Sequence, residues 1–443
     1  FKSKIMSNIS LIIYRRRETD QENYNYAKQL SKLDKNIFLI SHYDDKSIET
    51  GIFKNVNKIY YKKKSRHISN LKNFILTIIY IIKAYSSFTN FNNFIKNFKC
   101  SGIKLGDLIY DSYIRHDHKY LNPKFDFKFI KIMFFGIYRT LILENLIIKI
   151  NPKQIFIGTE TYINIPSICC RLGFKMNIKI IEMSKKNIKI HRHKQIYYGS
   201  DNIDTLERKK KFDNLKISEN KLNIFLKKRR LNKIILGGTS NYDNKITKGI
   251  KINTSKFIEK INKLKKIKKK IILFTPHAFS DSCSKCGFFV FTDYFDQVRQ
   301  TLKIIDNYKS NKNLIWIIKK HPSSNIYGEK NILKNASKSK NKKIIFCDEK
   351  VSIHEILKRS DIVITGRGTI GMEAISMGIP VVIGGKSRYS DIGIIDAPRN
   401  YLEYCNNLQN FINKLKKPSK RKMYLAKKIL YFYETQTFQD LMS

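Results

Sequence analysis

Several residue types and patterns are scarce in this sequence. Its 443 residues include 36 acidic against 86 basic side chains, 8 prolines and a single tryptophan. The 7 cysteines include one CxxC pair, Cys283 and Cys286, without the second pair that a zinc ribbon needs and without the strand–helix setting of a redox motif. We therefore expect free thiols in a reducing compartment rather than a disulfide framework.

Long apolar runs are missing as well. The longest, residues 74–82, is too short to cross a bilayer and is flanked by lysines. Residues 129–150 are apolar, but Lys131, Arg139 and Glu144 interrupt them, and this pattern indicates a buried helix. We expect neither a secretory signal nor a transmembrane segment, and hence a cytoplasmic protein that can lie at the inner face of the plasma membrane.

The shortage of acidic residues gives a formal net charge of +50. The lysines are scattered through the chain together with asparagine and isoleucine, as the coding bias of an AT-rich genome would produce. A nucleic-acid binder would concentrate them in a patch or a known module, and the sequence shows neither. We expect no nucleic-acid partner, and we favour contact of a basic surface with an anionic membrane.

The length favours two domains of about 200 residues each. Apolar runs alternate with amphipathic stretches, which predicts an α/β fold. Residues 202–230 are highly charged and resemble an inter-domain connection, and a new strand is expected at 233–236. We therefore divide the chain into domains 1–230 and 231–417, followed by a helix at 418–443 that could cross back over both.

Residues 360–383 are expected to form a βαβ unit: a buried strand, a glycine turn, a helix and a second strand. Gly378 lies where a left-handed helix C-cap is needed, and Pro380 stops the helix. A turn of this kind before a helix N-terminus holds a phosphate, because free N–H groups and the helix dipole favour an anion. The residues of the strand end and the turn are Thr365, Gly366, Arg367, Gly368 and Thr369.

Two residues around this turn have more specific expected roles. Thr369 is placed to cap the helix and to offer its hydroxyl to the same anion. Glu373 follows about one turn later, where a carboxylate can accept hydrogen bonds from a ribose diol. Arg367 could face the phosphate, the first domain or solvent.

Other predicted strands also end in polar residues. Because the carboxyl ends of parallel strands form one edge of a sheet, we expect these residues to line a ligand crevice. In the second half, Gly237 and Gly238 follow strand 233–236, His277 and Asp281 follow strand 270–275, and strand 314–318 leads into Lys320, His321, Pro322 and Ser323. In the first half, Glu160 follows strand 152–158 and is either a general base or an ordinary surface carboxylate. His277 and Asp281 either act as acid and base or cap the next helix.

The βαβ unit resembles the donor-binding unit of glycosyltransferases of the B type. The pair His321-Pro322, followed about forty residues later by this unit, resembles bacterial transferases that use CMP-activated acidic sugars, including capsule Kdo-transferases and sialyltransferases. The stretch PHAFSDS and the following FxDYFDQ also resemble capsule and surface-polysaccharide biosynthesis proteins. The acidic motif of the sialyltransferases is absent from the first domain, so the donor stays open.

This resemblance implies two Rossmann-like domains facing each other across a cleft (GT-B). It implies transfer of a sugar from a nucleotide-sugar, such as a CMP-linked acidic sugar, to a glycan or lipid-linked acceptor of capsule or lipopolysaccharide type. Because no DxD-type motif follows a strand, we expect no metal and no cofactor. The alternatives are a glycerol- or ribitol-phosphate transferase of teichoic-acid type, and a basic non-enzymatic protein that binds nucleic acid or a membrane surface.

Overall fold

The computed structural model describes most of the chain. The described residues are 10–14, 37–41, 57–60, 71–116, 118–157, 162–184, 187–191, 206–236, 255–284, 287, 289–308, 311–325, 327–329, 331–333, 344–347, 351–387, 389–390 and 392–435. They belong to two compact units. Unit 1 takes in Phe1–Lys119, Pro123–Ser200 and Gln436–Ser443, and unit 2 takes in Tyr120–Asn122 and Asp201–Thr435.

The sheet of unit 1 has the strand order β3-β2-β1-β6-β7-β8. Its pairs are parallel except for the last, β7 with β8. With β1 in the middle, this is the 3-2-1-4-5-6 order of a Rossmann sheet. The strands are β1 (Ser10–Tyr14), β2 (Ile37–Ser41), β3 (Asn57–Tyr60), β6 (Gln154–Ile157), β7 (Lys179–Ser184) and β8 (Asn187–His191).

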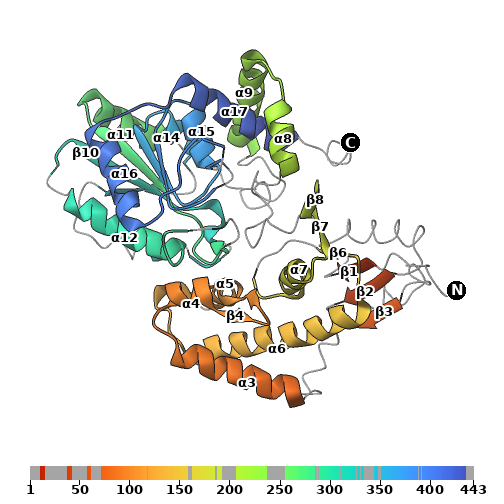
Figure 1. Cartoon of the computed structure of the whole chain (residues 1–443). Coiled ribbons are helices and arrows are strands. Elements are labelled where there is room, and N and C mark those ends of the chain that lie inside the picture. Colours follow the sequence, from red (N-terminus) through yellow and green to blue (C-terminus); the bar gives the residue numbers. More distant parts are fainter. Residues whose placement is uncertain are drawn as a thin grey trace. The chain divides into compact units, whose positions relative to one another are not determined.

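Helices of unit 1 begin and end where local side chains predict. Asp126 caps α6 by accepting a hydrogen bond from the Phe129 amide, and Asn151 ends it in the left-handed conformation. In Figure 1, α3 and α6 run side by side. The elements are α3 (Leu71–Ser86), α4 (Phe91–Asn97), α5 (Gly106–Ile114), α6 (Phe127–Ile150) and α7 (Ile165–Lys175), with the short hairpin β4 (Lys99–Cys100) and β5 (Ile103–Lys104).

The sheet of unit 2 has the order β11-β10-β9-β12-β13, and all of its pairs are parallel. This is again the Rossmann order, here with β9 in the middle. Its central strands are continuous runs of buried apolar residues, as a sheet covered on both faces requires. The strands are β9 (Lys270–Thr275), β10 (Leu314–Lys319), β11 (Ile344–Cys347), β12 (Ile362–Thr365) and β13 (Val381–Ile383).

Helices cover both faces of this second sheet (Figure 1). On one face the core joins apolar residues of α11, α14, α15 and α17 to the sheet. The helices and turns are η1 (Lys119–Leu121), α8 (Leu206–Asn214), α9 (Glu219–Leu236), α11 (Ser255–Lys266), α12 (Tyr294–Asn307), η3 (Pro322–Asn325), α14 (Ile353–Leu357), α15 (Ile370–Ser376), α16 (Tyr401–Asn413) and α17 (Lys420–Thr435).

The structure confirms the expected α/β class with two Rossmann-like sheets. One expected strand is wrong: residues 233–236 lie in α9, because so short an apolar run can continue a helix as well as form a strand. The longer segment of unit 2 runs from Asp201 to Thr435, and the charged stretch 202–230 contributes helices to it. The C-terminal helix α17 packs beside α9 and α15 within unit 2. Residues 436–443, the end of the expected helix 418–443, lie outside the described residues.

Candidate functional site

The carboxyl ends of β9, β10 and β12 lie level with one another in unit 2. Phe274 of β9 pairs with Ile318 on one side and with Ile364 on the other. The strand order reverses between β9 and β12, since β10 and β11 lie on one side of β9 and β12 and β13 on the other. Ligands of open α/β sheets bind outside the carboxyl ends of the strands at this point. The site is therefore expected at the residues that follow Thr275 and Thr365.

Three rings form a stack at this edge. His277, from the end of β9, lies between Tyr294 at the start of α12 and His321 at the end of β10. The His277 ring centroid is 4.5 Å from that of Tyr294 and 4.7 Å from that of His321, with interplanar angles of 18° and 19°. Nδ1 of His277 is 3.7 Å from Oδ2 of Asp281. The structure thus brings together three predicted residues, His277, Asp281 and His321.

The electrostatic state of His321 follows from this packing. Burial lowers the pKa of His321 to about 3, and the neighbouring His277 imidazole acts in the same direction. At neutral pH the His321 ring is therefore uncharged, with one N–H donor and one acceptor nitrogen. An anion bound beside it would favour the protonated form and raise this pKa.

A buried carboxylate ties the two histidine-bearing loops together. Glu329 accepts hydrogen bonds from the Phe279 amide at 3.1 Å, the Ser280 amide at 2.8 Å and the Ser280 hydroxyl at 2.7 Å. Its own amide donates to the carbonyl of Ser324, in the turn that follows His321, at 2.8 Å. Burial raises the pKa of Glu329, although these hydrogen bonds oppose the shift. Glu329 thus fixes the loop after His277 relative to the loop after His321.

The glycine turn after β12 is tightly packed. A Cβ on Gly366 would lie 3.1 Å from the Gln297 side chain and 3.1 Å from the Tyr294 ring, so only glycine fits without displacing its neighbours. The Gln297 amide also donates to the Thr365 carbonyl at 3.2 Å. Gly378 has φ of +79°, which confirms the expected left-handed helix end.

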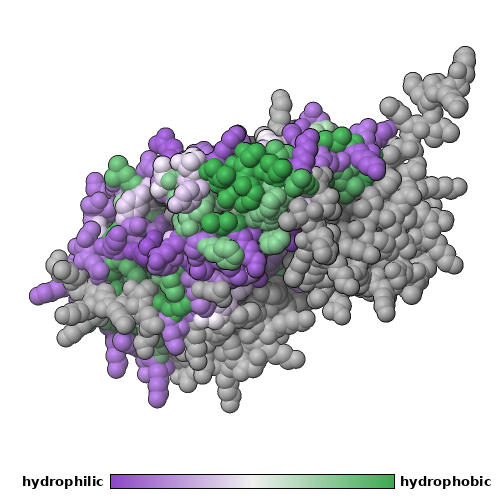
Figure 2. Space-filling model, turned by 90° about the horizontal axis from the view of Figure 1, so that it is seen from below, coloured by the Kyte–Doolittle hydropathy of each residue, from purple (hydrophilic) through white to green (hydrophobic). Residues whose placement is uncertain are grey.

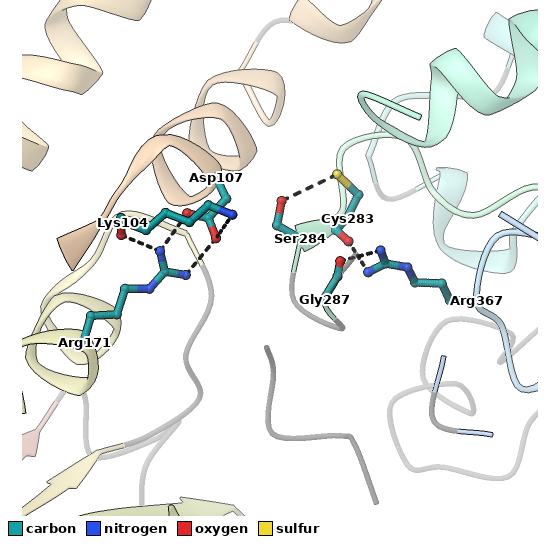
Figure 3. A network of polar contacts seen from close by, with 7 residues as sticks. All are labelled: Lys104, Asp107, Arg171, Cys283, Ser284, Gly287 and Arg367. Carbon is teal, nitrogen blue, oxygen red and sulfur yellow. Dashed lines mark hydrogen bonds and ion pairs between the residues drawn. The ribbon is translucent and has the colours of Figure 1, made fainter. Parts of the chain in front are cut away.

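Arg367 lies buried and faces the loop after β9. Its guanidinium donates to the carbonyl of Cys283 and, at 2.7 Å, to that of Gly287, as Figure 3 shows. It also lies over the Phe289 ring, 4.6 Å from the centroid. Of the three orientations left open for Arg367, the one toward solvent is wrong, because two backbone carbonyls and an aromatic ring hold this buried cation.

The helix after the turn differs from expectation in two further ways. Thr369 has helical backbone angles and makes no side-chain capping bond to α15, so the predicted cap is wrong. Its side chain is exposed beside the turn. Glu373 is buried and accepts a hydrogen bond from Arg229 Nη1 at 2.7 Å. Arg229 also binds Glu434 of α17. In this structure Glu373 therefore joins helices α9 and α15.

Other predicted site residues of unit 2 lie after β10 and in the turn after β12. Lys320 is half-buried and Pro322 is exposed, and the backbone of Ser323 lies in η3. Gly368 follows Arg367, and its carbonyl accepts a hydrogen bond from the Tyr389 hydroxyl at 3.0 Å. Glu160, Gly237 and Gly238 lie outside the described residues, as does Cys286.

Unit 1 contains its own buried polar cluster. Asp107 of α5 accepts two hydrogen bonds from Arg171 of α7, at 2.7 and 2.9 Å. Lys104 lies 3.9 Å from the same carboxylate, and its carbonyl accepts a third Arg171 bond at 2.6 Å (Figure 3). Arg171 lowers the pKa of Asp107 despite burial. Asp107 is thus the buried ion-pair partner of Arg171.

Sequence reasoning missed Glu329 altogether. Glu329 lies about fifty positions from the Phe279 and Ser280 amides that donate hydrogen bonds to it. No local sequence pattern indicates a contact between residues so far apart. Tyr294 carried a signal, since it stands in the FxDYFDQ stretch, but its stacking on His277 depends on tertiary structure. Within the described residues, no group of three or more His, Cys, Asp or Glu side chains could hold a metal ion.

Three comparisons show which known proteins this chain is similar to. Residues 205–439 match the family model described as capsule polysaccharide biosynthesis protein. No curated protein matches the chain. Similar solved structures include Staphylococcus aureus MnaA with UDP (12% identity, 95% of this chain and 91% of that chain, TM-score 0.29) and the UDP-GlcNAc 2-epimerase of Neisseria meningitidis (11%, 96% and 99%, 0.31). A glycosyltransferase from Rickettsia africae is 12% identical over 99% of this chain and 96% of that chain, with a TM-score of 0.30.

Proposed function

Because the chain belongs to the capsule polysaccharide biosynthesis protein family, we propose that it is a glycosyltransferase that transfers a sugar from a nucleotide-sugar to a surface glycan. The observation that carries the proposal is the stacked pair His277 and His321 at the switch point of the second Rossmann sheet. Two imidazoles and a lysine at such an edge are suited to bind a phosphate group of a nucleotide.

The proposed donor site uses residues from two strand ends. A neutral His321 donates one N–H to a phosphate oxygen of the donor, and Lys320 supplies a positive charge next to it. Proton uptake by His321 then accompanies the growth of negative charge on the phosphate. The exposed hydroxyl of Thr369 is a further donor from the turn after β12. We propose a CMP-linked acidic sugar as the donor, on the resemblance of the His321-Pro322 pair.

In the transfer itself, an acceptor hydroxyl oxygen bonds to the anomeric carbon of the sugar while the bond from that carbon to the phosphate oxygen breaks. The nucleotide leaves with the bonding electron pair, and the acceptor proton passes to a base. His277 is suited to this role because Asp281 lies 3.7 Å from its Nδ1 and can stabilise the imidazolium that forms. Glu160 is the alternative base from unit 1. We propose that the reaction needs no metal and that the acceptor is a glycan or lipid-linked glycan on the cytoplasmic side.

The test is turnover with a panel of nucleotide-sugars, measured as nucleotide release in the presence of a capsule-type acceptor. We expect one activated sugar to be consumed and His321→Ala to reduce turnover by about a hundredfold or more, the size of the loss of one oriented donor in a transition state. The control is His116→Ala, which removes an exposed histidine of unit 1. Release from CDP-glycerol or CDP-ribitol instead would favour the phosphate-transferase alternative. Near-normal turnover of a soluble His321→Ala protein would refute the site.

A further inference from the structure

Helix α3 of unit 1 exposes an apolar stripe, unlike the usual surface helix. Its buried side chains are Asn73, Thr77 and Ala84, and the Thr77 hydroxyl donates back to the Asn73 carbonyl at 2.7 Å. A soluble surface helix buries its apolar stripe and exposes its polar one. Here six large apolar side chains face outward, while Phe74, Leu76, Tyr80 and Ile81 are half-buried. The exposed ones are Leu71, Ile75, Ile78, Ile79, Ile82 and Tyr85, which we call the apolar face of α3.

These residues form one continuous stripe. Their spacing of three and four positions places them on one side of the helix along its whole length. Figure 2, seen from the side on which α3 lies in Figure 1, shows strongly hydrophobic side chains gathered together with hydrophilic ones around them. The neighbouring helix α6 adds Phe135, which is also exposed and contacts Phe134, itself packed on Phe74 of α3. Exposed patches of this kind mark interaction sites.

The charged residues of α3 and of its neighbour α6 are mostly basic. Helix α3 contains no acidic residue, and α6 contains only Glu144, which is paired with Lys175. The two helices contain six basic residues. They are Lys72, Lys83, Lys128, Lys131, Arg139 and Lys149.

We propose that the apolar face of α3 docks this protein onto an anionic phospholipid bilayer, with the helix lying in the plane of the interface. An apolar stripe with cationic neighbours suits that position, because the apolar side chains enter the acyl boundary while the lysines meet lipid phosphates. Tyr85 ends the stripe, where an amphipathic ring suits the headgroup level. Within the described residues, no helix is long and apolar enough to cross a bilayer.

Charge decides between a bilayer and a second copy of the chain as the occupant. Pairing two copies through this face would bring together two basic rims on chains that each carry a net charge of +50, which like-charge repulsion disfavours. Anionic lipid offers the opposite charge across the whole face. The inference concerns unit 1 and does not rest on the proposed function, because docking needs neither donor nor acceptor.

The experiment is co-sedimentation of the full chain with vesicles of phosphatidylcholine alone and of phosphatidylcholine with phosphatidylglycerol. The test variant is the double substitution Leu71→Gln and Ile82→Gln, with 68% and 60% of the two side chains exposed. The matched control in unit 2 is Leu402→Gln with Ile224→Gln, exposed by 68% and 62%. Leucine and glutamine have similar helix propensity and isoleucine a slightly lower one, so both variants should keep their helices, which circular dichroism checks.

We expect wild type and the control to bind anionic vesicles equally and the test variant to bind about thirtyfold more weakly, since two apolar side chains no longer enter the membrane. A second variant, Lys72→Gln with Lys131→Gln, should lose roughly fivefold per lysine on anionic vesicles and nothing on neutral ones. The proposal would be overturned if wild type, the Leu71 and Ile82 variant and the Lys72 and Lys131 variant all bound anionic vesicles equally. The proposal would also be overturned if wild type formed a dimer without lipid at both low and high salt, and if the Leu71 and Ile82 substitutions dissociated that dimer.

Discussion

Glu329 provides the sharpest prediction about how the candidate site is built. Replacing Glu329 with alanine removes an acceptor that binds the amides of Phe279 and Ser280 and the Ser280 hydroxyl. Phe279 and Ser280 are themselves buried, so water cannot take over these bonds freely. A buried amide without a partner costs about 1–3 kcal/mol, and two of them predict a loss of roughly 2–6 kcal/mol in the free energy of unfolding.

Glu329→Gln serves as the graded comparison. The glutamine amide keeps one acceptor oxygen but places an N–H₂ group opposite a donor. We therefore expect the free energy of unfolding of Glu329→Gln to lie between those of wild type and Glu329→Ala. The free energy of unfolding of the two variants should also depend on pH differently from that of wild type. Burial raises the pKa of Glu329, so the folded chain binds this proton more tightly than the unfolded chain does. Wild type should therefore lose stability as pH rises above the ordinary carboxyl range, and the Gln variant should lack that contribution.

Urea denaturation at several pH values measures these differences, and nucleotide binding measures their effect on the site. Because Glu329 links the loops that carry His277 and His321, we expect both variants to bind nucleotide more weakly even under conditions where they are fully folded. A Glu329→Ala protein with unchanged unfolding free energy and unchanged nucleotide affinity would refute this reasoning.

Other features of unit 2 give predictions of the same kind. Gly371→Ala should destabilise the fold by about 1–3 kcal/mol, because a Cβ there would lie 2.1 Å from the Tyr389 hydroxyl; thermal melting checks it, and an unchanged midpoint would contradict it. Arg229→Met should cost about 3–5 kcal/mol by leaving Glu373 buried without its cation, and adding Glu373→Leu should recover much of this; absence of recovery would contradict the pairing. His321, with its pKa near 3, binds a proton more readily when unfolded, so wild type should lose stability as pH falls below about 6.5 and His321→Gln should lose less; parallel pH profiles would argue against it. Turnover should survive EDTA, and restoration of a lost activity by Mg²⁺ or Mn²⁺ would overturn the metal-free proposal.

The strands of unit 2 could be predicted because their apolar runs are short, buried and bounded by clear signals. The two strands of the βαβ unit expected over residues 360–383 are present as β12 and β13, and Gly378 takes the left-handed conformation expected of it. The convergence of His277 and His321 followed from the rule that parallel strands share a carboxyl edge. These features depend on local pattern and topology, which a sequence displays directly.

The failures arise where tertiary contacts decide. The run 233–236 continues the helical pattern of α9, and its four residues alone could not exclude a strand. Arg367 and Glu373 carry charges that suit a phosphate and a ribose, yet distant partners bind both of them within the fold. Arg367 binds Cys283 and Glu373 binds Arg229, and each pair is separated by more than eighty positions. No local sequence pattern indicates contacts between residues so far apart.

The central claim is that His321 binds the donor phosphate, and calorimetric titration with nucleotides tests it most directly. Titrating CMP, CDP, UDP and GDP in buffers of different ionisation enthalpy gives both the affinity and the number of protons taken up. We predict that one nucleotide binds wild type with proton uptake, because its phosphate raises the low pKa of His321. His321→Ala should lose the uptake and bind roughly ten- to a hundredfold more weakly, whereas His116→Ala should match wild type. Equal affinity and equal proton uptake in His321→Ala would contradict the account.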